Sequence, residues 1–331
     1  MELTNRDTSR DCPPVLIQED PVTSPRSRLV VYCRLLVTAS LVAALTACTT
    51  TVTRMPAGSG FSNLIPAEEL PQKGQQDPAS LIARGESLLA SGQGQLATTL
   101  FVQALQQEPE NLTAASGLGN ALLASGRYQA AGKVFERILQ DRPDDLFALR
   151  GAVRACRSGG NLEKARSYLK QALALAPDDP HLLCEQAGFY QDRGEPGKAE
   201  PLYRRIVQLQ ADDAAAYNNL GFNRILLGEY ADAIASLSRA LALEPKNQRI
   251  KNNLAVAWAL GGREEVAYNL FRDGLGEAAA WNNVGFLLAA RGEWQGATSS
   301  LQRAMDSNPV FYPRASDNLE QIRRLAAGHG Q

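Results

Sequence analysis

A 34-residue period runs through the chain from residue 78 onward. Its clearest mark is a glycine that is followed five residues later by an alanine. The glycines are Gly92, Gly126, Gly160, Gly194, Gly228, Gly262 and Gly292, and the alanines are Ala97, Ala131, Ala165, Ala199, Ala233, Ala267 and Ala297. A regular spacing of this length is typical of an array in which every repeat is one small supersecondary unit. The sequence therefore predicts seven repeats.

Each repeat is expected to be a pair of helices, because apolar-periodic stretches lie on both sides of the glycine. Glycine can adopt the positive φ that ends the first helix, and the alanine lets the second helix pack closely against the first. Five repeats close with a proline that stops the second helix, namely Pro109, Pro143, Pro177, Pro245 and Pro309. One such pair cannot bury its apolar face alone, but stacked neighbours can.

This pattern resembles the tetratricopeptide repeat. Seven units fit at 78–111, 112–145, 146–179, 180–213, 214–247, 248–277 and 278–311, followed by a capping helix at 312–326 and a tail at 327–331. The resemblance implies an all-α, right-handed superhelical solenoid over residues 78–326.

Two repeats depart from the pattern. AAAYNNLGF at 214–222 returns as AAAWNNVGF at 278–286, four residues earlier than two full periods require. The loss falls after Phe271, so we expect the second helix of the sixth repeat to lose its last turn and the superhelical pitch to change. The last repeat and the cap would then be partly set apart. In the fourth repeat, Pro201 removes a helical hydrogen bond and Ala211 replaces the usual proline, which predicts the weakest point of the array.

The first 77 residues have a different composition. Residues 1–28 are polar and expected to be disordered. Residues 29–47 are typical of a signal peptide, because the apolar run Leu35–Leu45 is too short to span a membrane. The run ends in Leu-Thr-Ala before Cys48, which resembles a bacterial lipobox and predicts acylation (a palmitate-type anchor) of Cys48. The alternative is an ordinary signal peptide that a cysteine follows by chance.

Thr49 follows this cysteine where an aspartate would indicate retention at the inner membrane, so we expect an outer-membrane anchor facing the periplasm. Residues 48–77 are rich in Thr, Pro, Gly and Gln, which predicts a flexible tether. The acidic residues of segment 1–28 do not suit the positively charged start of a signal peptide. Our hypothesis is that translation begins near Val30 or Val31.

The sequence offers little for catalysis. The two histidines are His181 and His329, and neither is paired with an obvious nucleophile. Cys156 and Cys184 are expected to lie out of register on neighbouring helices, too far apart for a disulfide. GLGNAL at 117–122 lacks the third glycine and the preceding strand of a dinucleotide-binding loop, so it is interpreted as helix packing. We expect no enzyme activity, cofactor, metal site or small-molecule substrate.

The charge balance also argues against nucleic acid, because Lys and Arg total 34 against 35 Asp and Glu. Protein partners remain. In tetratricopeptide proteins the first helix of each repeat lines a concave groove that binds peptides. The matching positions carry amides and apolar groups that can read a peptide backbone and its side chains. They are Asn218, Asn219, Phe222, Asn252, Asn253, Val256, Asn282, Asn283 and Phe286. The alternative is that the second asparagine of each pair ties adjacent helices together.

The third repeat differs, since Arg150, Arg154 and Arg157 share one face of its first helix. Such a stripe could bind an acidic segment or a carboxylate. Alternatively, Glu185 and Asp192 of the next repeat neutralise it.

The C-terminal half is similar to one family in particular. The shortened sixth repeat, the NNLA-x-A and NNVGF strings and the terminal YPRASDNL resemble TadD, the tetratricopeptide lipoprotein of the Flp/Tad pilus system, over residues 214–326. The resemblance implies a pilotin-like assembly factor that acts on a secretin or another pilus component. The alternative is a periplasmic scaffold for another envelope machine, such as outer-membrane protein assembly, polysaccharide export or peptidoglycan enzymes.

Overall fold

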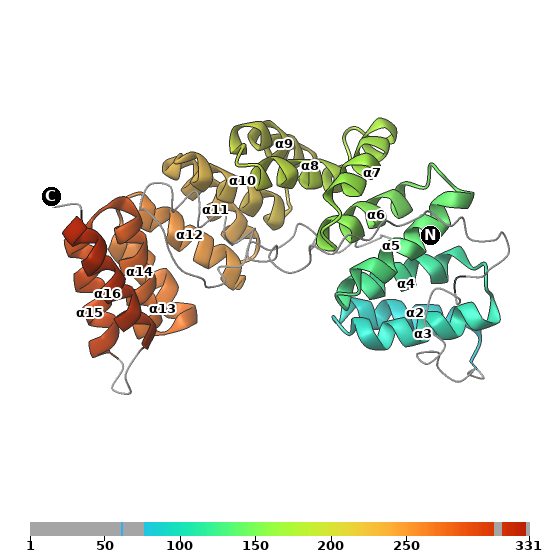
Figure 1. Cartoon of the computed structure of the whole chain (residues 1–331), viewed down its shortest axis with the longest axis horizontal. Coiled ribbons are helices and arrows are strands. Elements are labelled where there is room, and N and C mark those ends of the chain that lie inside the picture. The colour runs from blue at the N-terminus through green and yellow to red at the C-terminus, as the bar shows by residue number, and fades with distance from the viewer. Residues whose placement is uncertain (1–60, 62–75, 308–312, 329–331) are drawn as a thin grey trace. The chain divides into compact units, whose positions relative to one another are not determined.

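The structure, a computed structural model, describes residues 61, 76–307 and 313–328. Every regular element over 76–307 and 313–328 is a helix (Figure 1). The first helices of the repeats, here called A helices, are α2 (Pro78–Ala90), α4 (Leu112–Ala124), α6 (Leu146–Ser158), α8 (Pro180–Asp192), α10 (Ala214–Leu227), α12 (Gln248–Leu260) and α14 (Glu277–Arg291). The B helices are α3 (Gly94–Gln107), α5 (Tyr128–Asp141), α7 (Leu162–Leu175), α9 (Pro196–Leu209), α11 (Tyr230–Leu243), α13 (Glu264–Leu275) and α15 (Trp294–Asp306), and α16 (Pro313–Gly328) follows.

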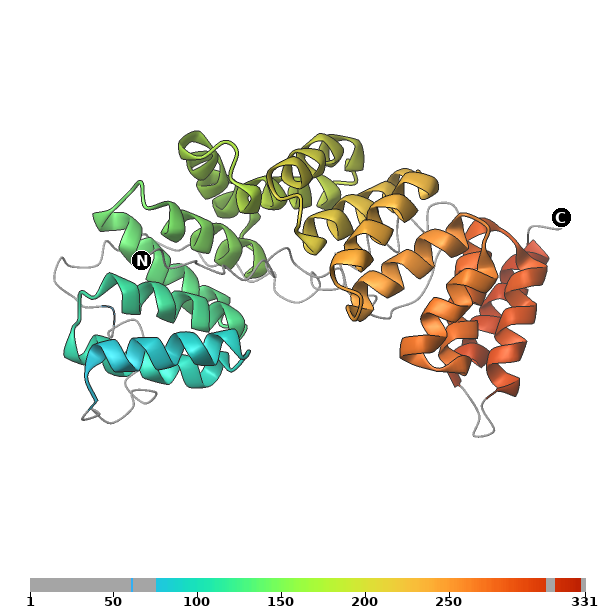
Figure 2. The ribbon, with the colours of Figure 1, turned by 180° about the vertical axis from the view of Figure 1, so that it is seen from behind.

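The helices pack in the order of the chain. Five A helices contact both the B helix of their own repeat and the B helix before it, namely α4, α6, α10, α12 and α14. Consecutive A helices also contact each other from α2 to α6 and from α10 to α14. Figure 2 shows these helix pairs from behind. The all-helical repeat fold expected from the sequence is therefore confirmed.

The chain forms two compact units, and the division between Glu185 and Gln186 lies within α8. It therefore falls in the fourth repeat, and the weakness expected there from Pro201 and Ala211 stays a prediction. Pro201 is inside α9, and the helix nevertheless continues from Pro196 to Leu209.

The turn between the A and B helices forms as predicted. All seven glycines of the period have φ between +71° and +83°, a conformation that a side chain with a Cβ rarely adopts. At the other end of several A helices an Asp or Asn side chain accepts hydrogen bonds from backbone N–H groups of the first turn. These N-caps include Asp77, Asn111, Asp145, Asp213 and Asn247.

Large B-helix side chains fill spaces left by A-helix glycines. The Phe101 ring lies where a Cβ on Gly85 or Gly117 would stand, and the Phe135 ring does the same at Gly119 and Gly151. Both rings are fully buried. Gly117 and Gly119 belong to the GLGNAL string, so its interpretation as helix packing is confirmed.

The shortened sixth repeat differs in part from the expectation. Helix α13 has 12 residues where α11 has 14, so it loses half a turn and not a whole one. The connection to α14 shrinks to Gly276 alone, whereas residues 244–247 join α11 to α12, and α14 begins one residue early. Gly276 has φ +82° and caps both helices. The linker therefore takes most of the loss.

The last repeat and α16 are not set apart, contrary to the prediction. One buried apolar cluster runs from Ile225 to Ile322 and includes Phe271, Ala280 and Leu301. The Tyr268 and Trp281 rings also stack across the shortened connection, 4.0 Å between centroids. The single-residue linker brings α13 and α14 close enough to share a core.

Several expectations lie outside the described residues. They concern the segments 1–28 and 29–47, Cys48, nearly all of 48–77, and His329 in the tail. Among the described helices, none combines the length and apolar character needed to cross a membrane.

Candidate partner-binding face

The predicted groove residues separate into two groups in the second unit. Six of them are half-buried on the A helices α10, α12 and α14, and we call these six the A-helix row. They are Asn219, Phe222, Asn252, Val256, Asn283 and Phe286. The row gives each of three consecutive repeats one amide and one apolar side chain that solvent can reach.

The other three asparagines join helices to one another. Asn218 is only 3% exposed, and its Oδ1 accepts a hydrogen bond from Nδ2 of Asn253 at 2.8 Å. Asn282 is 8% exposed, and its Oδ1 accepts one from Nδ2 of Asn318 in α16 at 2.9 Å. Buried side chains in such bonds cannot line an accessible groove, so the prediction for Asn218 and Asn282 is corrected. Asn253 behaves as the helix-tying alternative expected.

The amides of the A-helix row are partly oriented by their neighbours. Gln248 donates from Nε2 to Oδ1 of Asn252 at 2.9 Å, one turn earlier on the same helix. The bond uses the oxygen of the Asn252 amide, and the Nδ2 of the same group is a donor. A row of amides beside apolar groups can bind a peptide backbone and sort its side chains.

The arginine stripe of the third repeat is largely paired within the first unit. Arg157 Nη1 donates to Oε2 of Glu185 at 2.9 Å, and Glu185 is 7% exposed. Arg150 Nη1 lies 3.5 Å from Oδ2 of Asp179. Arg154 is half-buried on the same helical face. The expected partner Glu185 therefore neutralises Arg157, while Asp179 partners Arg150 without having been anticipated.

A buried polar network was missed by the sequence analysis. Glu200 of α9 is 9% exposed and accepts hydrogen bonds from Asn223 Nδ2, Arg204 Nε and Arg224 Nε, each at 3.0 Å. Asn223, which is fully buried, also donates to the carbonyl of Pro196 and accepts from Gln191 Nε2 at 3.0 Å. The network ties α8, α9 and α10 together beside Pro201.

Opposing effects set the pKa of Glu200. Burial alone would raise it, but the hydrogen bonds from Asn223, Arg204 and Arg224, with the charge of Arg224, hold the pKa below its usual value. The sequence did contain a signal. Asn223 stands where the other repeats carry Ser, Ala, Phe or Leu, and an amide at an otherwise apolar or small position needs buried partners.

The remaining candidates for chemistry have structural roles. Cys156 is a free and buried thiol, so it forms no disulfide with Cys184, as expected. Burial, with the negative charge of Glu136, raises the pKa of the Cys156 thiol and so disfavours the reactive thiolate. The backbone N–H of His181 donates to Asp179 at the start of α8. In the described part of the chain no cluster of three or more His, Cys, Asp or Glu side chains is placed to hold a metal.

Comparison with protein families agrees with this geometry. Models described as tetratricopeptide repeat match residues 88–156, 158–220 and 214–247. Residues 88–156 and 158–247 are tetratricopeptide repeats. Proteins with this repeat are generally non-enzymatic scaffolds that bind protein partners.

Three similar proteins illustrate the range of such repeats. The crystal structure of TTC0263, a thermophilic tetratricopeptide protein of Thermus thermophilus, is 25% identical with a TM-score of 0.50, over 54% of this chain and 98% of that one. The BBSome complex member bbs-4 of Caenorhabditis elegans is 25% identical over 45% of this chain, which spans a third (33%) of that relative's length. PilW, a type IV pilus biogenesis factor, is 19% identical with a TM-score of 0.51, over 63% of this chain and 96% of that one.

Proposed function

We propose that this protein is a non-enzymatic outer-membrane lipoprotein that faces the periplasm and assists the assembly of a Flp/Tad-type pilus. It would act as a pilotin-like scaffold, holding a secretin or another pilus component on its A-helix row while acylated Cys48 anchors it to the membrane. No nucleic acid, cofactor or small-molecule substrate is part of this proposal.

One observation carries the binding part of the proposal. The A-helix row presents an amide and an apolar side chain on each of α10, α12 and α14. These residues remain half-exposed, whereas the asparagines beside them form hydrogen bonds between helices. Amide and apolar groups in alternation match an extended or helical protein segment, which offers backbone polar groups and apolar side chains together.

The pilus part rests on sequence strings similar to TadD. Two of those strings meet in the structure, because Asn282 of NNVGF accepts the hydrogen bond from Asn318 of YPRASDNL. The two strings that resemble TadD therefore contact each other between α14 and α16. For this reason we treat them as one piece of support and not as two independent ones. PilW shares the fold alone, and it shows that a chain of this fold can be a pilus biogenesis factor.

A second candidate is a scaffold for another periplasmic assembly machine. The A-helix row suits this function equally well, since nothing in an amide and apolar row selects a pilus component. The two candidates differ in the partner that is captured.

In-cell photo-crosslinking tests both. A photoreactive residue replaces Phe222 in the row, and a second variant carries it at Ser238, which is exposed on the B helix α11. Capture of a secretin or another pilus component from position 222, but not from 238, supports the pilus function. Capture of barrel-assembly, export or cell-wall proteins supports the alternative. Equal capture from both positions, or capture from 238 alone, contradicts the A-helix row as the binding face.

A further inference from the structure

Phe61 is buried although it belongs to the segment expected to be a free tether. Its side chain is 1% exposed, and it belongs to the same apolar cluster as residues of α3 and α5. Its backbone N–H donates to the carbonyl of Pro109, 3.3 Å away, just after the end of α3. An aromatic ring and a backbone hydrogen bond thus hold this residue on the first two repeats.

The surface of α3 differs from that of the other B helices. Val102 and Leu105 are 1% and 0% exposed. At the position of Val102 the other repeats carry polar residues, which are half-buried at Glu136 and exposed elsewhere. These residues are Glu136, Lys170, Arg204, Ser238, Arg272 and Gln302. At the position of Leu105 no other repeat has a fully buried residue. Val102 is therefore apolar where the other repeats carry polar side chains, whereas the position of Leu105 is apolar in every repeat and only its complete burial is particular to the first.

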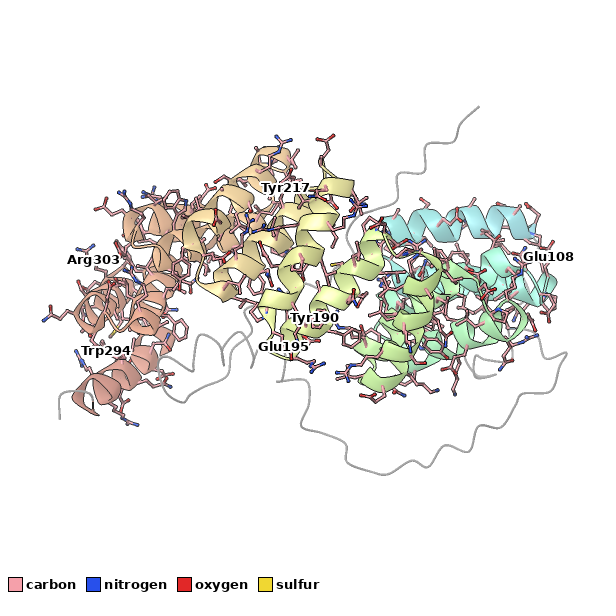
Figure 3. All side chains as sticks on the ribbon, turned by 90° about the horizontal axis from the view of Figure 1, so that it is seen from above. Glu108, Tyr190, Glu195, Tyr217, Trp294 and Arg303 are labelled. Atoms are coloured by element: carbon pink, nitrogen blue, oxygen red, sulfur yellow. The ribbon has the colours of Figure 1, made fainter. Side chains whose placement is uncertain are left out.

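Arg137 of α5 supplies the third element of the site. Its guanidinium carbon lies 5.7 Å from the centre of the Phe61 ring. The arginines at the same position of the fifth and seventh repeats also lie over rings, Arg239 over Tyr217 at 5.9 Å and Arg303 over Trp281 at 4.8 Å. Tyr217 and Arg303 are labelled in Figure 3. A cation over an aromatic face is a favourable contact.

The aromatic ring beneath this arginine comes from a different part of the chain in the second repeat. In the fifth and seventh repeats the ring comes from the fourth residue of the same repeat, Tyr217 or Trp281. In the second repeat that position is Ala115, and Arg137 lies over the ring of Phe61 instead. Val102, Leu105, Arg137 and the carbonyl of Pro109 thus form a site suited to an aromatic residue on a separate stretch of chain.

We propose that this site is a docking site for the N-terminal segment of the protein's own chain, with Phe61 as the anchoring residue. Burial of the Phe61 ring supplies most of the binding energy, because the removal of a large apolar side chain from water is the main favourable contribution to such a contact. The hydrogen bond to Pro109 and the charge of Arg137 fix its position.

Docking shortens the tether, a consequence that rests on the proposed acylation of Cys48. With Phe61 released, residues 49–77 link the anchor to the repeats and extend to about 100 Å at most. With Phe61 docked, the stretch between the anchor and the docked residue is 49–60, whose fully extended length is about 40 Å. The site therefore sets how far the repeats can move from the membrane.

Hydrogen exchange measured by mass spectrometry tests the docking site on the mature chain. The variants are Phe61→Ala, which removes the ring, and Val102→Lys, which places in the first repeat the residue that the third repeat carries as Lys170. The control is Ser238→Lys, which introduces the same residue at the same repeat position of α11. We expect about a tenfold faster exchange of the peptide containing Phe61 in both variants, and wild-type exchange in the control.

Three results would overturn the docking site. Wild-type exchange in Phe61→Ala and Val102→Lys, or rapid exchange of this peptide in the unaltered protein, overturns the proposal. Protection that disappears on dilution also overturns it, because the site would then bind the Phe61 of a second copy. None of these results depends on the partner, so failure of the docking site and failure of the pilus function are distinguishable.

Discussion

Asn253 of α12 donates a hydrogen bond to Asn218 of α10, and the acceptor is almost completely buried. Replacing Asn253 with Ala leaves a buried oxygen without its donor, which costs about 1 to 3 kcal/mol. Replacing the half-exposed Asn219, whose Oδ1 accepts a longer hydrogen bond of 3.5 Å from Nδ2 of Asn218, should cost less, about 1 kcal/mol at most. Urea denaturation measures both values, and equal losses would show that the bond contributes nothing specific.

The same two variants separate stability from binding. If the A-helix row binds the partner, Asn219→Ala should reduce the amount of pilus component that is crosslinked from position 222, while the fold stays intact. Circular dichroism provides the check on folding. Unchanged capture would remove Asn219 from the proposed face.

The glycines beneath Phe101 give a second prediction. A methyl group at Gly117 would collide with the ring, so Gly117→Ala should destabilise the protein by about 1 to 3 kcal/mol through overpacking. Gly132 is helical too, but its nearest neighbour would be the Cβ of Ala155 at 3.8 Å. Gly132→Ala should therefore be neutral or stabilising by up to about 1 kcal/mol. Thermal unfolding compares the pair, and a similar loss in both would contradict the packing described.

The Glu200 network predicts a dependence of stability on pH. The pKa of Glu200 is lower in the folded protein than its usual value, so its contribution is present above the unfolded pKa of about 4.3 and is lost as the pH falls through the folded value. Glu200→Gln should thus be destabilising near neutral pH and cost less as the pH falls through the lowered pKa of Glu200, where this side chain becomes protonated in the folded protein as well. A cost that stays constant with pH would contradict an ionised Glu200.

The Arg157–Glu185 pair should matter more than an exposed pair. Glu185→Ala removes the carboxylate that pairs with Arg157, whose side chain is 14% exposed, and breaking a buried pair costs up to about 3 to 5 kcal/mol. Glu163→Ala breaks the exposed pair with Arg166 and should cost less than about 1 kcal/mol. Denaturant unfolding of the two variants measures these losses in stability. A loss below about 1 kcal/mol for Glu185→Ala would show that water screens this pair as well.

The repeat framework could be predicted from the sequence because its causes are local. A glycine at the end of an A helix is needed for a positive φ, and this requirement depends only on the residue itself. The same holds for the caps at Asn111 and Asp145, which bond within one turn. Such features recur at fixed spacing and are visible without a structure.

The candidate site was harder to predict because it depends on pairs. Asn218 and Asn219 are the same residue type in adjacent positions, and only the neighbouring helix decides which one is buried. Phe61 has no periodic context at all, and its burial depends on an apolar patch on α3 that the sequence analysis did not compare across repeats. The shortening of the sixth repeat was assigned wholly to its second helix for a related reason. A deletion shows in the sequence only as a shorter repeat, and the sequence does not say whether the helix α13 or its linker lost the residues.

Gly276 is the only residue between α13 and α14, so the connection cannot absorb a change in length. One residue ends the first helix and begins the second, whereas four residues join α11 to α12. A single inserted residue that extended α14 would turn its faces by about 100° about the helix axis. Asn283 and Phe286 would then exchange places with side chains now directed into the core, so this junction sets the rotational phase of everything that follows it.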